Sequence, residues 1–159
     1  MIRVSILMTI LLFAASCDQK SINPEEVLSA SRNVTNARAG FDQLPGKWTF
    51  TDYLKDKTVP ADGEATLEFT TTEKTNTLQV GGRAFVNLYG STFIYDEAKS
   101  TIQLIEPVST TKMAGTPEMM KAESAFLNNL KNVTKFSVDG AVLKLYVGEP
   151  ATEVMYFKR

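Results

Sequence analysis

Histidine is absent from this 159-residue sequence, and cysteine occurs once, at Cys17. Without imidazole groups or a second thiol, the chain offers no His/Cys site for zinc, copper or haem, no imidazole base and no internal disulfide. Any catalysis would depend on carboxylates, lysine, tyrosine or serine. We therefore predict that the protein is not an enzyme, and we assign no catalytic residue, no metal ligand and no cofactor.

Long apolar runs are also scarce, and the most pronounced one lies near the start of the chain. Arg3 precedes an apolar run at residues 6–13, and the small residues 14–16 stand directly before Cys17. A run of about ten residues has the length of a signal-peptide core and is too short to cross a membrane. We interpret residues 1–16 as a lipoprotein signal peptide and Cys17 as the lipidation site, carrying acyl chains such as palmitate. The alternative is an ordinary secretion signal beside an incidental cysteine.

The lipoprotein interpretation predicts where the protein works. Two or more acyl chains on Cys17 would give a stable membrane anchor. We therefore expect a protein of the cell envelope that faces the periplasm. Asp18 resembles an inner-membrane retention signal of enterobacteria, but sorting rules differ among bacteria, so both the inner and the outer membrane stay open.

Polybasic segments are absent as well. Loss of Arg3 with the signal leaves 16 of the 17 Lys+Arg against 18 Asp+Glu, a net charge of −2, so we expect no nucleic-acid partner. The remaining chain of about 143 residues has the size of one domain. We assign residues 17–43 to the lipidated cysteine and a tether, with a short helix that Asn23 can cap, and residues 44–159 to the domain. A partner-binding role for the tether helix is the alternative.

From residue 44 onward, apolar residues recur with a period of two, which predicts β-strands. Trp48 and Phe50, for example, alternate with Lys47 and Thr49, and Trp48 is expected to anchor the core. The expected strands lie around residues 48–54, 65–69, 78–89, 92–95, 102–108, 134–138, 142–147 and 153–157.

Residues 117–131 break this alternation and predict a helix. Thr116 can cap its start, Pro117 suits the first helical position, and apolar residues such as Phe126 and Leu130 recur at helical spacing. The predicted fold class is α+β, with a mainly antiparallel sheet of seven or eight strands and one packed helix in the C-terminal half.

Five segments carry more specific motifs: Leu44-x-Gly46-x-Trp48, Gly82-Arg83-x-x-x-Asn87-x-Tyr89-Gly90, Thr110-Thr111-Lys112-Met113-Ala114-Gly115, Glu123-x-x-Phe126-x-x-x-Leu130 and Phe136-x-Val138-x-Gly140. Together they resemble the META domain, the family of the bacterial heat-shock protein HslJ, over residues 44–159. The resemblance implies an antiparallel sheet that can curl into a partly open barrel with one helix packed on it. It also implies export, lipid anchoring and a link to envelope stress, and it supplies no agreed catalytic residues.

The sequence departs from the family pattern at two positions. Family members often carry cysteines where this chain has Val86 and Gly115. A thiol-based function is therefore not implied for this chain, whereas the implied fold is unaffected.

Gly82, Arg83, Asn87, Tyr89 and Met113 are the candidate residues of a binding surface. The segment around Gly82 and Arg83 can shape a nest of backbone N–H groups that binds an anion, although a turn or bulge is the simpler interpretation. Asn87 and Tyr89 can orient a ligand in a pocket, but such an asparagine more often bonds a neighbouring loop.

Two further sets of side chains have a simple structural interpretation. Met113, Met119 and Met120 could bind copper(I) through their thioethers, but filling core gaps is the usual role of methionine. Glu118 and Glu123 lie five residues apart and so do not face each other on a helix. We expect Glu118 to favour the helix start and Glu123 to pack or to bond a loop.

These patterns predict a lipid-anchored envelope protein whose META-like domain binds a protein partner or braces the envelope during stress. Its partners would be the membrane, through Cys17, and an envelope protein. The alternative function is a carrier that holds an acyl chain or another small apolar ligand in a barrel-like cavity. That cavity would be lined by Phe85, Tyr89, Phe93 and the helix methionines, and a tightly packed interior would exclude it.

Overall fold

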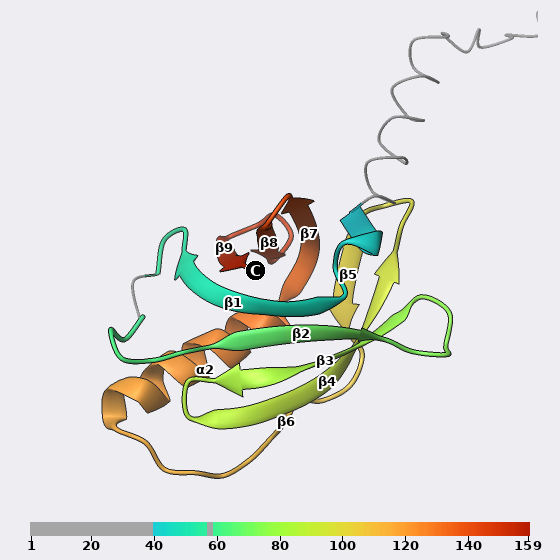
Figure 1. Cartoon of the computed structure of the whole chain (residues 1–159). Helices are drawn as coiled ribbons and strands as arrows, with labels where there is room; N and C mark the ends of the chain where they lie inside the picture. The colour runs from blue at the N-terminus through green and yellow to red at the C-terminus, as the bar shows by residue number, and fades with distance from the viewer. Residues whose placement is uncertain (1–39, 57–58) are drawn as a thin grey trace, which may run out of the picture.

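The computed structural model describes residues 40–56 and 59–159 (Figure 1). The signal peptide, Cys17 and the tether helix expected from the sequence lie outside these residues. Within the described ranges, no helix has the length and apolar character needed to span a membrane.

Nine β-strands and the helix α2 build the domain, and every strand pair is antiparallel. Helix α2 (Pro117–Lys131) stands between β6 and β7 in the chain. The predicted fold class is confirmed. The strands are β1 (Gly46–Tyr53), β2 (Thr66–Thr71), β3 (Thr77–Ala84), β4 (Asn87–Asp96), β5 (Thr101–Leu104), β6 (Ser109–Thr110), β7 (Val133–Asp139), β8 (Val142–Val147) and β9 (Glu153–Lys158).

The sheet closes on itself to form a barrel, as the curved strands in Figure 1 show. Its strand order is β3-β2-β1-β9-β8-β7-β5-β4, and β4 pairs in turn with β3. The remaining strand, β6, lies beside the first half of β4, while β5 pairs with the second half. Closure leaves these eight barrel strands without the long open edge of a flat sheet.

The turn between β3 and β4 differs from the sequence prediction. A strand was expected to run through Phe85, but Phe85 has a φ of 61° and forms the turn together with Val86. Strand β4 then runs unbroken for ten residues and includes the separately predicted strand at 92–95. Because both turn residues are buried apolar side chains, the sequence lacks the polar signal that usually marks a hairpin turn.

Helix α2 begins and ends where the sequence predicts. The Met119 N–H donates a hydrogen bond of 3.3 Å to the Thr116 hydroxyl, which confirms Thr116 as the N-cap. Lys131 lies in the last turn, where a cation is favourable at the helix C-terminus. The side of the helix that faces the barrel buries Ala122, Glu123, Phe126 and Leu130.

Aromatic rings fill the barrel interior around Phe126. Its ring centroid lies 5.5 Å from Phe50 on β1, 5.8 Å from Tyr89 on β4, 6.1 Å from Phe85 and 6.2 Å from Phe157 on β9. These contacts are edge-on, which is a favourable arrangement for aromatic pairs. Since β4 and β9 lie on opposite sides of the ring of strands, one helix residue packs against both walls.

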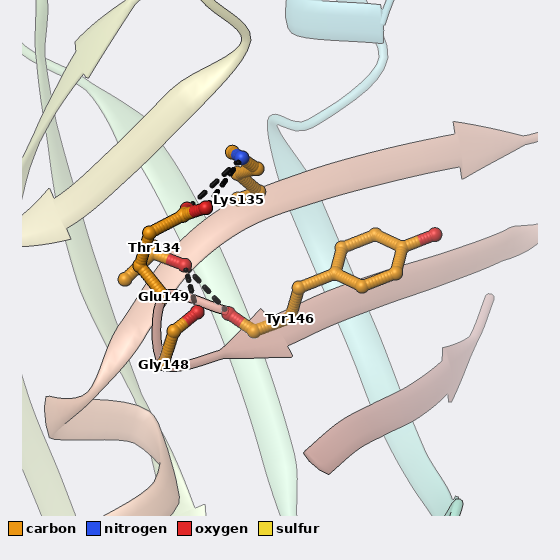
Figure 2. A network of polar contacts seen from close by, with 5 residues as sticks. All are labelled: Thr134, Lys135, Tyr146, Gly148 and Glu149. Carbon is orange, nitrogen blue, oxygen red and sulfur yellow. Dashed lines mark hydrogen bonds and ion pairs between the residues drawn. The ribbon is translucent and has the colours of Figure 1, made fainter. Parts of the chain in front are cut away.

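A network of hydrogen bonds and one ion pair connects β7 to the segment between β8 and β9 (Figure 2). The Thr134 hydroxyl donates a hydrogen bond of 2.8 Å to the Gly148 carbonyl and lies 3.5 Å from the Tyr146 carbonyl. The Lys135 ammonium pairs with the Glu149 carboxylate at 2.9 Å. This ion pair is exposed and contributes little, whereas the Thr134 bond lies where the β7–β8 register shifts and connects β7 to Gly148.

Trp48 anchors the core, as predicted. Its side chain is fully buried, and its indole N–H donates a hydrogen bond of 2.9 Å to the Leu44 carbonyl. The Arg159 guanidinium lies 4.3 Å from the ring centroid, a cation–π distance that connects the end of the chain to β1.

Trp48→Ala is therefore expected to lower the free energy of unfolding by about 3–5 kcal/mol, because it leaves a large cavity and removes the indole hydrogen bond. Urea denaturation followed by circular dichroism measures the change. A melting temperature within a degree or two of the wild-type value would contradict the anchoring role.

Candidate functional site

The β3–β4 hairpin brings together all the residues that the sequence singles out for binding. Gly82 and Arg83 lie near the end of β3, Asn87 and Tyr89 begin β4, and Met113 lies in the connection before α2. Burial separates them into two groups. Asn87 and Tyr89 are 2% and 5% exposed, whereas Met113 is 59% exposed and Arg83 is also exposed. Asn87 and Tyr89 are therefore not part of an accessible surface.

Asn87 is hydrogen-bonded to the buried carboxylate of Glu123. The Asn87 backbone N–H donates to Glu123 Oε2 at 2.7 Å, and Asn87 Nδ2 donates to Glu123 Oε1 at 2.9 Å. Because Glu123 is only 7% exposed, these charge-assisted bonds take the place of water around the carboxylate. Glu123 is therefore buried and bonded as a structural residue, as expected, but its partner is the first residue of β4 and not a loop.

The side-chain oxygen of Asn87 holds the segment that leads into α2. Asn87 Oδ1 accepts hydrogen bonds from the Thr111 hydroxyl at 2.8 Å and from the Met113 N–H at 2.7 Å. Asn87 Nδ2 also donates to the Met113 carbonyl at 3.2 Å. We call Asn87, Thr111, Met113 and Glu123 the Asn87 cluster. It joins β4, the connection and the helix, so its polar groups serve the fold.

Gly82, Arg83 and Tyr89 gather around Thr66 of β2. The Tyr89 hydroxyl donates to the Thr66 carbonyl at 2.9 Å, and burial raises the pKa of Tyr89 above its ordinary value. The Arg83 N–H donates to Thr66 Oγ1 at 3.0 Å, and its guanidinium donates to the Val86 carbonyl at 3.3 Å. A Cβ on Gly82 would collide with the Thr66 carbonyl. These contacts occupy the Arg83 amide that an anion nest would need. The turn or bulge expected at Gly82 and Arg83 is not found either, because both residues lie within β3 and pair in unbroken register with Tyr89 and Leu88 of β4.

The side chains expected to line a carrier cavity are packed against other rings. Phe85 and Tyr89 contact Phe126, and the Phe93 ring lies 5.8 Å from the Phe69 ring. Phe93 is completely buried. The barrel interior is therefore filled at the positions where a carrier would need space.

The described residues offer no metal site built from carboxylates. Residues 40–56 and 59–159 contain no group of three or more His, Cys, Asp or Glu that could hold an ion. The predicted methionine group is divided, because Met113 is exposed while Met119 is partly buried against the core. Glu118 is exposed in the first helical turn, and both oxygens of Glu123 accept bonds from Asn87.

An elongated groove crosses the outer face of β2, β3 and β4, and we call it the outer groove. Its central hollow has a volume of about 540 Å³, and adjoining hollows of about 410 and 510 Å³ share lining residues with it. The lining is mostly polar. The side chains at its centre include Glu68, Thr70, Gln79, Thr92, Glu106 and Ser109.

Two glycines that face each other across β3 and β4 form the floor of the outer groove. The register pairs Gly81 with Gly90, and the same row continues to Glu68 on β2 and Ser109 on β6. Successive residues of a strand point to opposite faces, and Val80 beside Gly81 is buried, so this row lies on the outer face. The opposed glycines leave the backbone uncovered there.

Residues 42–159 match the family model described as META domain. The chain belongs to the META domain family. Among solved structures, this META domain is similar to the NMR structure of a protein from Burkholderia xenovorans, with 17% identity, a TM-score of 0.58 and coverage of 79% of this chain and 87% of that chain. This likeness supports the fold alone.

A second similar structure is a crystal structure of a DUF4847 family protein from Bacteroides vulgatus. It has 15% identity and a TM-score of 0.48, and the match covers 72% of this chain and 92% of that chain. No curated protein matches the sequence.

Of the residues predicted for a binding surface, Gly82 lines the central hollow of the outer groove, and Arg83 and Tyr89 line an adjoining hollow. The rest of the groove of this META domain is not predicted from the sequence, because its residues come from segments that only the strand register brings together. Gly90 and the pair Gly81-Gly82 are available signals, since glycine within a strand pattern suggests a close backbone approach. Glu106 reaches the groove only because its segment folds against β4. The Ser91 hydroxyl donates to the Glu106 carbonyl at 2.8 Å, and the Thr92 hydroxyl donates to Glu106 Oε2 at 2.7 Å.

Asn87→Ala is expected to lower the free energy of unfolding by about 3 kcal/mol, because the buried Glu123 carboxylate loses its side-chain donor and the connection before α2 is released. Urea denaturation measures the change. The matched control is Asn128→Ala on the exposed side of α2, for which a change within about 0.5 kcal/mol is expected. Equal effects of the two substitutions would show that the Asn87 cluster does not hold the fold.

Proposed function

We propose that this META domain protein is a non-enzymatic binding protein of the bacterial cell envelope, anchored by lipid on Cys17 and facing the periplasm. The observation that carries the binding role is the outer groove, whose floor is the opposed pair Gly81 and Gly90. Recognition at an outer surface needs no catalytic group. The buried carboxylate of Glu123 is hydrogen-bonded to Asn87 within the fold, which supports a structural role for it.

A carrier function has less support than surface binding. A carrier needs interior space, and the rings of Phe50, Phe85, Tyr89 and Phe157 are packed around Phe126. Loss of that packing to admit a ligand would cost the buried contacts that stabilise a small core.

The proposed location and the link to stress have separate support. The location rests on the lipoprotein signal that the sequence predicts before Cys17. The link to envelope stress rests on the resemblance of the sequence motifs to the family of the heat-shock protein HslJ, and the family match itself covers residues 42–159. The partner in this proposal is an envelope protein that docks on the outer groove.

Cys17→Ser is expected to abolish incorporation of labelled palmitate and to shift the protein from the membrane fraction to the soluble fraction, because serine carries no thiol for acyl attachment. Metabolic labelling followed by fractionation of host cells measures both effects. Full labelling of the serine variant would contradict the anchor at Cys17.

A photo-crosslinking residue at position 79 tests surface binding in living cells. Gln79 is exposed and lines the outer groove, so we expect a discrete crosslinked product with an envelope protein that increases after heat or envelope stress. The control position is Thr49, which is exposed on β1 outside the groove. Binding through the outer groove is wrong if position 79 gives no product, or if both positions give the same products.

A further inference from the structure

We infer that the outer groove binds an extended peptide segment that presents a lysine or arginine side chain to Glu68 and Glu106. This inference rests on the proposed binding function and adds the chemistry of the partner. It draws on three features of the groove, which are its bare floor, its length and the charge at its centre.

The local fold does not require a glycine at position 90. Gly90 has no left-handed φ, and a Cβ there would meet only the Val80 carbonyl oxygen at 3.8 Å, an ordinary contact distance. A β-branched residue would suit this strand position better than glycine. Gly81 is more constrained, since its Cβ would lie 3.3 Å from the Tyr89 carbonyl oxygen. The bare surface at Gly90 therefore fits the close approach of a second backbone.

The length of the outer groove fits an extended chain. Its central hollow shares Glu68 with the hollow near Arg83 and shares Gln79 with the hollow near Lys74. A peptide that follows these three hollows runs along β3 on the outer face of β2 to β4 and passes over Gly90. Side chains along the way, such as Gln79, offer hydrogen bonds to its backbone.

The charge at the centre of the groove specifies the side chain. Glu68 and Glu106 line the central hollow, and its lining contains no lysine or arginine. The Thr92 hydroxyl donates to Glu106 Oε2 and so holds this carboxylate beside β4. Lys47 and Arg83 line the adjoining hollow at one end of the groove. A cation is therefore favoured at the centre, and electrostatic complementarity gives the site its specificity.

The first test titrates the full-length ¹⁵N-labelled protein in non-ionic detergent micelles with the capped peptide Ala-Thr-Ala-Lys-Ala-Thr-Ala. We expect saturable shifts of the Gly81 and Gly90 amide signals that weaken as salt is added, because exposed charge pairs are screened. The same peptide with glutamate in place of lysine is expected to cause no shift. Equal shifts with both peptides would overturn the requirement for a cation.

Gly90→Val separates binding from folding. Valine favours a β-strand, and a Cβ at this position meets no atom closer than 3.8 Å, so the melting temperature is expected to stay equal or rise while peptide binding is lost. Thr49→Val places the same residue on an exposed position of β1 outside the groove and is expected to leave binding unchanged. Undiminished binding by folded Gly90→Val would overturn the groove as the peptide site.

The paired substitution Glu68→Gln and Glu106→Gln tests the charge without changing side-chain size. At low salt it is expected to raise the Kd of the lysine peptide roughly tenfold, which corresponds to the loss of two exposed charge pairs. An unchanged Kd would overturn the role assigned to the carboxylates.

The outcome also distinguishes this inference from the proposed function. Suppose that position 79 crosslinks a partner in cells, and that the glutamate peptide or a glycan such as chitotriose shifts the Gly81 and Gly90 amide signals whereas the lysine peptide does not. The basic peptide is then the wrong occupant, and binding at the outer surface stands. If no peptide shifts these amides and position 79 gives no crosslink, both the inference and the proposed function are wrong.

Discussion

The hydrogen bonds between Glu123 and Asn87 connect the helix to the barrel, and the rest of the structure depends on that connection. A carboxylate that is 7% exposed is stable only where donors surround it, so the position of Glu123 sets how α2 lies against β4. With α2 in this position, Phe126 enters the barrel and packs against rings from opposite walls. The same asparagine holds the segment at Met113, so one buried amide organises three parts of the chain.

This packing gives the inside and the outside of the barrel different roles. Inside, aromatic rings occupy the space that a small ligand would need, and the Tyr89 hydroxyl bonds to Thr66. Outside, the wall has no side chains at the paired glycines Gly81 and Gly90. Because the eight barrel strands have no long open edge, a partner that binds here meets an outer face. The outer groove is the hollowed part of that face, where we propose that a partner binds.

The sequence predicts those features that depend on local pattern. Trp48 and the full extent of α2 follow from periodicity and capping residues, whereas the partner of Glu123, Asn87 on β4, becomes evident only in the structure. The turn at Phe85 is missed because its residues are apolar and buried, so the apolar pattern of the sequence continues through it. The sequence points to Gly82, Arg83 and Tyr89, which line the outer groove, but misses the rest of it for a different reason. Its position depends on the register across β2, β3, β4 and β6, which no single segment contains.

A native mass spectrum of the full-length protein, purified in mild detergent from the envelope of its host, tests most directly the claim that the interior is packed and that function resides outside. We predict a mass that corresponds to the polypeptide and its covalent lipid, with any additional mass belonging to a peptide or protein partner. A reproducible apolar ligand of a few hundred daltons, released when the protein is denatured, would contradict this account and support a carrier.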